Sequence, residues 1–223
     1  MKKLIAIALV VLMLIPFAAC GTTNNNTTPD EAAPTTSAPT TTANSTTPAP
    51  VVDPNGATRG KVVNYIYTNI FSGVTFNADN TWNFYPDSSL AALYGITEDA
   101  LKNENLQTTI TGNGAVYDVY AQKVTKDILE ASFSLTYING NDAFVKDMSV
   151  EEFVDTTAAS TGIDVATAKT DNVAYGGRTF CRITSETNEK TVIIAACRIN
   201  NVIVMINAFS TKDSTVNFAE ILK

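Results

Sequence analysis

Cysteines are the most reactive side chains of this chain, and two of the three, Cys181 and Cys197, lie in its C-terminal third. A short turn near residues 188–190 would place them on neighbouring strands, so a cross-strand disulfide is one interpretation. Buried free thiols are the other, because Cys181 shares an apolar face with Ile183 and Cys197 shares one with Ile193. Either interpretation gives both cysteines a structural role.

Acid–base and metal chemistry is limited by the absence of histidine from the whole chain. Without histidine there are no histidine-based catalytic triads, histidine metal sites or imidazole proton relays. Carboxylates remain, but their spacing singles out no pair for glycoside hydrolysis. The acidic residues between 142 and 152 lack the spacing of an EF-hand and suit a solvated helix start. We therefore predict no catalytic, cofactor-binding or metal-binding residue.

Aromatic residues gather in one stretch, which contains Trp82, Phe84, Tyr85 and Tyr94. Tryptophan and tyrosine are common at recognition sites, so Trp82 and Tyr85 are the candidate partner-binding residues. Packing in the core is the alternative, because these side chains bury an apolar body readily when the polar tip finds a partner.

The third cysteine, Cys20, follows an apolar run from Leu4 to Phe17 that is preceded by two lysines and is short for a transmembrane helix. The run ends in Phe17-Ala18-Ala19-Cys20-Gly21, which resembles the lipobox of bacterial lipoproteins. The resemblance implies that residues 1–19 are a signal peptide and that Cys20 carries a diacylglycerol. Several acyl chains anchor a protein stably, so we expect attachment to the extracytoplasmic face of the cell membrane. An ordinary signal peptide with a chance cysteine is the alternative.

The net charge argues against nucleic acid as a partner. The chain has 15 basic and 22 acidic residues. Loss of residues 1–19 would remove two lysines and leave 13 basic residues, a formal net charge of −9. A field of that sign repels phosphate backbones and anionic lipid headgroups.

Composition divides the rest of the chain in two. Residues 20–58 are rich in Thr, Asn, Ala and Pro, have no aromatic residue and cannot bury a core. At ~3.1 Å per residue, such a tether would reach on the order of 100 Å when extended. Residues 59–223 have the composition of a single globular domain.

Local patterns in that domain predict strands and helices in a mixed order. The first half should contain strands at 62–70, 74–76 and 82–85, a helix opened by Pro86 and ended by Gly95, and a short helix capped by Thr97. A strand pair should follow at 117–121 and 129–137. Ser149 and Glu152 have the spacing of a helix capping box.

The C-terminal third predicts an antiparallel meander with turns at Gly176-Gly177 and Asn200-Asn201, and a last helix capped by Asp213. The last two strands are apolar on both faces, so both faces of the sheet should be covered. We therefore predict an α+β fold, an α/β/α sandwich in which helices cover both faces of an antiparallel sheet.

This order of elements is similar to the PsbP-like fold. The residues that carry the resemblance are Tyr67-Thr68-Asn69, Trp82-Asn83-Phe84-Tyr85, Tyr175-Gly176-Gly177-Arg178 and the segment 216–222. The stretch 65–93 also resembles uncharacterised lipoproteins of clostridia and related Gram-positive bacteria. PsbP-like domains serve as extrinsic subunits of membrane complexes, assembly factors and binding proteins for small GTPases. None of their functional residues can be placed here, so the resemblance implies only the fold and a general role.

Two functions are compatible with these observations. The first is a non-catalytic binding or accessory module that docks on an envelope protein, a wall polymer or a membrane complex. An exposed apolar patch beside a sheet edge would favour it. The second is a small-molecule or hydrolytic function in a cleft between sheet and helices, which converging carboxylates would favour.

Overall fold

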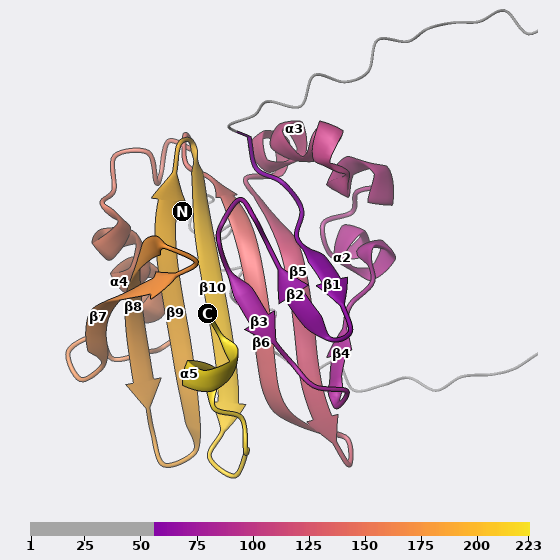
Figure 1. Cartoon of the computed structure of the whole chain (residues 1–223). Coiled ribbons are helices and arrows are strands. Elements are labelled where there is room, and N and C mark those ends of the chain that lie inside the picture. Colours follow the sequence, from indigo (N-terminus) through magenta and orange to yellow (C-terminus); the bar gives the residue numbers. More distant parts are fainter. Residues whose placement is uncertain (1–55) are drawn as a thin grey trace, which may run out of the picture.

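The computed structural model describes residues 56–223 of the chain. The expected signal peptide, Cys20 and most of the expected tether lie outside this range. The described residues form two antiparallel sheets, one of three strands and one of seven, together with several short helices (Figure 1). The α+β class predicted from the sequence is therefore confirmed.

The larger sheet forms the body of the molecule, and all its neighbouring strands are antiparallel. From one edge to the other, its strands are β4 (Trp82–Phe84), β5 (Ala115–Thr125), β6 (Ile128–Asn139), β10 (Val202–Thr211), β9 (Lys190–Ile199), β8 (Arg178–Glu186) and β7 (Lys169–Tyr175). The predicted C-terminal meander is confirmed by β7 to β10. Its last strand inserts beside β6, which joins the two halves of the chain in one sheet.

The smaller sheet has the order β1 (Lys61–Val63), β2 (Ile66–Thr68) and β3 (Thr75–Asn77). The single strand predicted at 62–70 is therefore wrong. Asn64 and Tyr65 have φ angles of 50° and 64°, which reverse the chain in a two-residue hairpin turn. Asparagine tolerates this left-handed conformation, and two successive positive φ angles match the twist of a tight hairpin.

The helices are short and lie between the strands in sequence. They are α2 (Asp87–Leu93), the 3-10 helix η1 (Glu98–Leu101), α3 (Asn103–Asn113), α4 (Val150–Ser160) and α5 (Phe218–Ile221). The predicted capping box of α4 is confirmed, since the Glu152 amide donates to Ser149 Oγ over 3.1 Å and the Ser149 amide donates to Glu152 Oε2 over 2.9 Å. The predicted cap of the last helix is wrong, because Asn217 rather than Asp213 caps it.

Two apolar clusters pack on opposite faces of the larger sheet. Successive residues of β10 divide between them, with Val204 in one cluster and Met205 in the other. The first cluster lies between the two sheets, where the rings of Phe76 and Phe133 stack with centroids 4.1 Å apart. The second lies under α4, which packs against β8 and β9. This division explains why β9 and β10 are apolar on both faces.

The folded part begins slightly earlier than the boundary expected at residue 59. Ala57 is buried in the first cluster, and the carbonyl of Thr58 accepts a hydrogen bond of 2.6 Å from the hydroxyl of Tyr137. In the described part of the chain, no helix is both long and apolar enough to cross a bilayer.

Candidate functional site

Trp82, one of the two candidate partner-binding residues, is a core residue. Its side chain is only 4% exposed. Its ring lies edge-on to Phe76, with centroids 4.9 Å apart, and close to Phe218 at 6.5 Å. The expectation that Trp82 contacts a partner is therefore wrong, and the alternative of core packing is confirmed.

Tyr85, the other candidate, lies half-buried at the mouth of a cavity. Its ring packs against Tyr120 with centroids 4.8 Å apart, and its hydroxyl donates to Gln122 Oε1 over 3.1 Å. These contacts hold the ring in one orientation. Tyr85 is thus placed where it can contact a bound molecule without rearrangement.

Cys181 and Cys197 are both buried and free, so the cross-strand disulfide is wrong. The register of β8 and β9 pairs Cys181 with Ala196, one residue away from the arrangement that a disulfide needs. Because side chains alternate along a strand, this offset places the two cysteines in different clusters, on opposite faces of the sheet. Burial raises the pKa of both thiols, that of Cys197 to about 12.

A buried carboxylate that the sequence did not reveal lies in β5. Tyr117 pairs with Thr136 and Val119 pairs with Leu135, so Asp118 is an extra residue in the strand, a β-bulge. The bulge turns Asp118 inward, and its side chain has no exposed surface. The signal in the sequence was an acidic residue within an apolar strand, but simple alternation places that residue outside.

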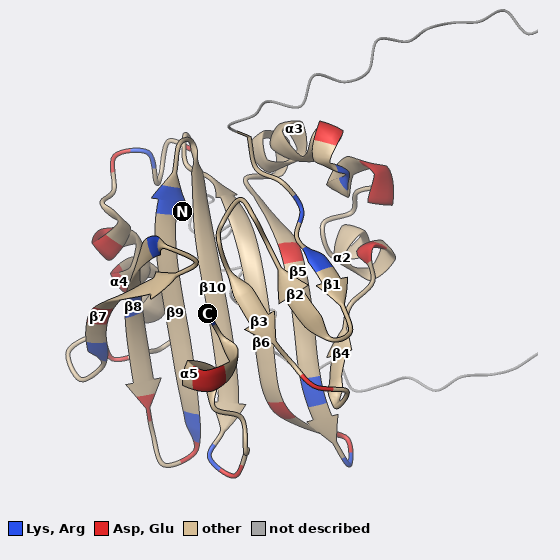
Figure 2. Ribbon diagram, in the orientation of Figure 1, with Lys and Arg blue, Asp and Glu red and all other residues tan. Residues whose placement is uncertain are grey.

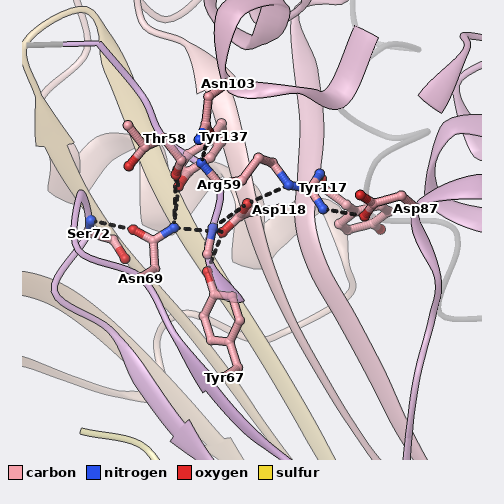
Figure 3. Close-up of polar contacts among 11 residues, drawn as sticks. Thr58, Arg59, Tyr67, Asn69, Ser72, Asp87, Asn103, Tyr117, Asp118 and Tyr137 are labelled. Atoms are coloured by element: carbon pink, nitrogen blue, oxygen red, sulfur yellow. Dashed lines mark hydrogen bonds and ion pairs between the residues drawn. The ribbon is translucent and has the colours of Figure 1, made fainter. Parts of the chain in front are cut away.

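Donors from two segments, residues 59–60 and 67–69, surround the Asp118 carboxylate (Figure 3). The Gly60 amide donates to Oδ2 over 3.0 Å, the Asn69 side chain over 2.7 Å, and the Tyr67 hydroxyl also donates to Oδ2. The guanidinium of Arg59 places Nε 3.1 Å from Oδ1. A buried carboxylate is tolerated because it has this many partners.

Burial raises the pKa of the Asp118 carboxyl above its ordinary value, although Arg59 and the hydrogen-bond donors act in the opposite direction. Burial and the nearby Asp118 charge likewise raise the pKa of Tyr67. The carboxylate is enclosed, and its oxygens are occupied by groups of the protein itself. This arrangement fits a structural anchor for the start of the domain.

Arg59 extends the network outward to the helical segment. Its Nη2 lies 2.6 Å from Asp87 Oδ1, and its Nη1 donates to the Tyr117 carbonyl over 3.2 Å. Its backbone amide donates to Asn103 Oδ1 over 2.6 Å. Arg59, two residues before β1, is therefore tied to the starts of α2 and α3 as well as to β5.

A cavity of about 490 Å³ opens beside this network, between β1 and the segment from α2 to α3. Its buried floor is formed by Tyr67, Leu90, Leu101, Asp118 and Val119. Its outer wall includes Val62 and Tyr85, and its polar rim is formed by Arg59, Asp87, Lys102, Asn103 and Glu104. It is a cleft between sheet and helices, as one of the two predicted functions requires.

An exposed apolar surface lies on the other side of β1. We name it the hairpin surface, and it consists of Val63, Tyr65, Ile66 and Ile70. Ile70, in the loop after β2, is 95% exposed, and Val63 is 63% exposed. β1 is an edge strand, and no charged residue lies on β2 or β3 (Figure 2). A single strand over residues 62–70, as predicted from the sequence, would not form this surface, because the surface depends on the reversal of the chain at Asn64 and Tyr65.

No group of three side chains capable of holding a metal ion occurs within residues 56–223. The acidic residues Asp142, Asp147, Glu151 and Glu152 do not form such a group.

Comparison with known proteins gives no family for this chain. It matches no protein-family model and no curated protein. One solved structure, from Bacteroides thetaiotaomicron VPI-5482 at 1.50 Å resolution, is similar with a TM-score of 0.35 and 13% sequence identity. The similarity covers 75% of this chain and 48% of that one, so this chain spans about half the length of that protein. A similarity at this level does not identify a function.

Proposed function

We propose that the protein is a lipid-anchored, extracytoplasmic binding module that docks on an envelope protein through the hairpin surface. The observation that carries the proposal is the exposure of four large apolar side chains at a sheet edge, three of them on the β1–β2 hairpin and Ile70 in the loop that follows it. Monomeric proteins rarely leave a contiguous apolar patch without a partner. Aromatic and aliphatic residues of this kind form the centre of protein interfaces.

The chemistry of the partner follows from the hairpin surface. The outer face of β1 and β2 carries Lys61, Val63, Ile66 and Thr68, so one lysine borders an otherwise uncharged surface. The partner should offer an apolar patch with a carboxylate at its rim. The lysine places a positive charge at the border of the hairpin surface. An acidic residue of the partner is therefore its favoured neighbour.

The position of the hairpin surface favours a partner in or near the membrane. β1 begins at Lys61, three residues after the end of the expected tether at residue 58. If Cys20 is lipidated, that tether links the bilayer to the strand beside the hairpin surface. Anchoring to the same membrane raises the effective concentration of such a partner.

A non-catalytic role is supported by the state of the buried carboxylate. Both oxygens of Asp118 are occupied by protein donors, and Arg59 neutralises its charge. A general acid or base needs a free proton-transfer position within reach of a substrate.

We further propose a PsbP-like arrangement with helices on both faces of the sheet, in which the module acts as an accessory subunit.

Capture from envelope extract tests the docking proposal when it compares matched variants. The full-length lipoprotein should retain one discrete membrane protein, and Val63→Ser with Ile70→Ser should abolish retention. The control is Val124→Ser with Ile128→Ser, which changes two exposed apolar residues at the tip of the β5–β6 hairpin. Equal retention by all three proteins would refute docking through the hairpin surface.

The anchor is tested separately by Cys20→Ser. The wild-type chain should incorporate labelled palmitate and sediment with membranes, and the variant should do neither. Unchanged labelling in the variant would refute lipidation at Cys20.

A second function is favoured by the cavity between β1 and the helical segment. Its volume of about 490 Å³ is within the range of small-molecule sites, and its lining combines apolar side chains with several polar and charged groups that could orient a ligand.

A further inference from the structure

We infer that this cavity binds an uncharged ring that is rich in hydroxyl groups, the chemistry of one sugar unit of a wall polymer. The inference deepens the second function proposed above and uses side chains other than those of the protein-docking hairpin surface. It rests on the pairing of the cations of the rim, on its free hydrogen-bonding groups and on the apolar side chains of the lining.

The pairing of the cations of the rim disfavours an anionic ligand. Arg59 pairs with Asp118 and with Asp87, and Lys102 pairs with Asp99 over 2.7 Å. An anion would have to displace a carboxylate from one of these pairs. Glu104 is a further carboxylate of the rim. A cation attracted to it would also meet the Arg59 guanidinium, which lies between Asp118 and Asp87 (Figure 3). A neutral ligand avoids both penalties.

The free groups of the rim suit hydroxyls. Arg59 occupies only Oδ1 of Asp87, and its backbone amide occupies only the amide oxygen of Asn103. Within residues 56–223, Asp87 Oδ2, the amide nitrogen of Asn103 and the Glu104 carboxylate make no hydrogen bond. The rim thus presents acceptors and a donor close together. A hydroxyl group donates and accepts at once, so a ring with several hydroxyls satisfies such a mixture.

The wall of the cavity suits the C–H face of a ring. Val62 and Tyr85 form it, Leu90 and Leu101 continue it into the floor, and the orientation of Tyr85 is fixed by Tyr120 and Gln122. A rigid aromatic side chain contributes contact area with little loss of conformational entropy. The size of the cavity suits one ring unit with a connection to the next unit through the open mouth.

Titration of the detergent-solubilised full-length lipoprotein with small probes tests the inference. The probes are glucose and N-acetylglucosamine as neutral sugars, inorganic phosphate as an anion and putrescine as a cation. We expect saturable binding of at least one sugar with a Kd on the order of 1 mM, observed by isothermal titration calorimetry and by ligand-detected NMR. Neither charged probe should bind at comparable concentration.

Two substitutions at Glu104 separate the hydrogen bond from the charge. Glu104→Ala should weaken sugar binding about tenfold, because one hydrogen bond is lost. Glu104→Gln should retain most of the affinity. Glu151→Gln, on exposed α4 surface, is the control and should bind like the wild type.

The inference is overturned if no sugar binds saturably, if Glu104→Ala binds as well as the wild type, or if a charged probe binds in preference. Val63→Ser with Ile70→Ser, which removes apolar groups from the hairpin surface, should leave sugar binding unchanged. Failure of protein docking and failure of sugar binding are therefore distinguishable.

Discussion

Arg59 Nε lies 3.1 Å from Oδ1 of Asp118, so the residue that follows the expected tether forms an ion pair with a carboxylate that has no exposed surface. The Arg59 side chain is itself 14% exposed. Through this pair the start of the domain is attached to the bulge of β5. The contact fixes the residues that immediately precede β1 to the larger sheet.

Replacement of Arg59 by methionine should lower the free energy of unfolding by roughly 3–5 kcal/mol, because it leaves a buried carboxylate without its counter-ion. Chemical denaturation of the purified chain measures the change. Arg182→Met is the matched control, since Arg182 forms a more exposed pair with Asp171 and should cost about 0–1 kcal/mol. Similar costs for the two variants would contradict the anchoring role of Arg59.

The Asp118 carboxyl should titrate above its ordinary pKa of 3.8, because burial disfavours the charged form. Between that value and the raised pKa, the folded state binds more protons than the unfolded state, so this group makes stability fall as pH rises through the window. Carboxyl-labelled NMR measures the pKa directly. Asp118→Asn should remove this part of the pH dependence, and an Asp118 pKa below 3.8 would show that Arg59 and the donors outweigh burial.

Gly176 should tolerate alanine much less well than its neighbour Gly177. Both glycines have positive φ, so alanine at either costs roughly 1–2 kcal/mol of backbone strain. A Cβ at Gly176 would also overlap the carbonyl oxygen of Gly73, whereas nothing lies within 4 Å of one at Gly177. Thermal unfolding should therefore show a clearly larger loss for Gly176→Ala, and equal losses would mean that the contact between these two loops is unimportant.

The two buried thiols should be inert in the folded protein. Their raised pKa values and burial keep them protonated and out of reach of reagents. A thiol-specific chromophoric reagent should modify neither Cys181 nor Cys197 until denaturant is added, and then both. Mild oxidation should produce no intramolecular crosslink, and a crosslink in folded protein would contradict the observed register of β8 and β9.

The sequence predicted the elements that depend on local chemistry. The Ser149 and Glu152 capping box, the Gly176-Gly177 turn and the alternating strand 129–137 were all predicted correctly, because each depends on neighbouring residues alone. α3 was missed, since its run of threonine and asparagine has low helix propensity and is stabilised by packing against β5 and β6.

The features that define the site depend on pairing between distant segments. Alternation in 117–121 places Asp118 outside, and only the bulge opposite Thr136 and Leu135 turns it inward. The prediction of a disulfide was wrong for a related reason, because a shift of one residue between two strands moves a side chain to the other face. Neither register is encoded in a short window of sequence.

The most direct test of the central claim is photo-crosslinking in living cells, with a photoreactive amino acid at Ile70 of the full-length chain and, as a control, at exposed Glu189. We predict that Ile70 gives one discrete crosslinked membrane protein, that Val63→Ser abolishes this product, and that position 189 gives no such product. The same products from both positions, or none from Ile70, would contradict docking through the hairpin surface.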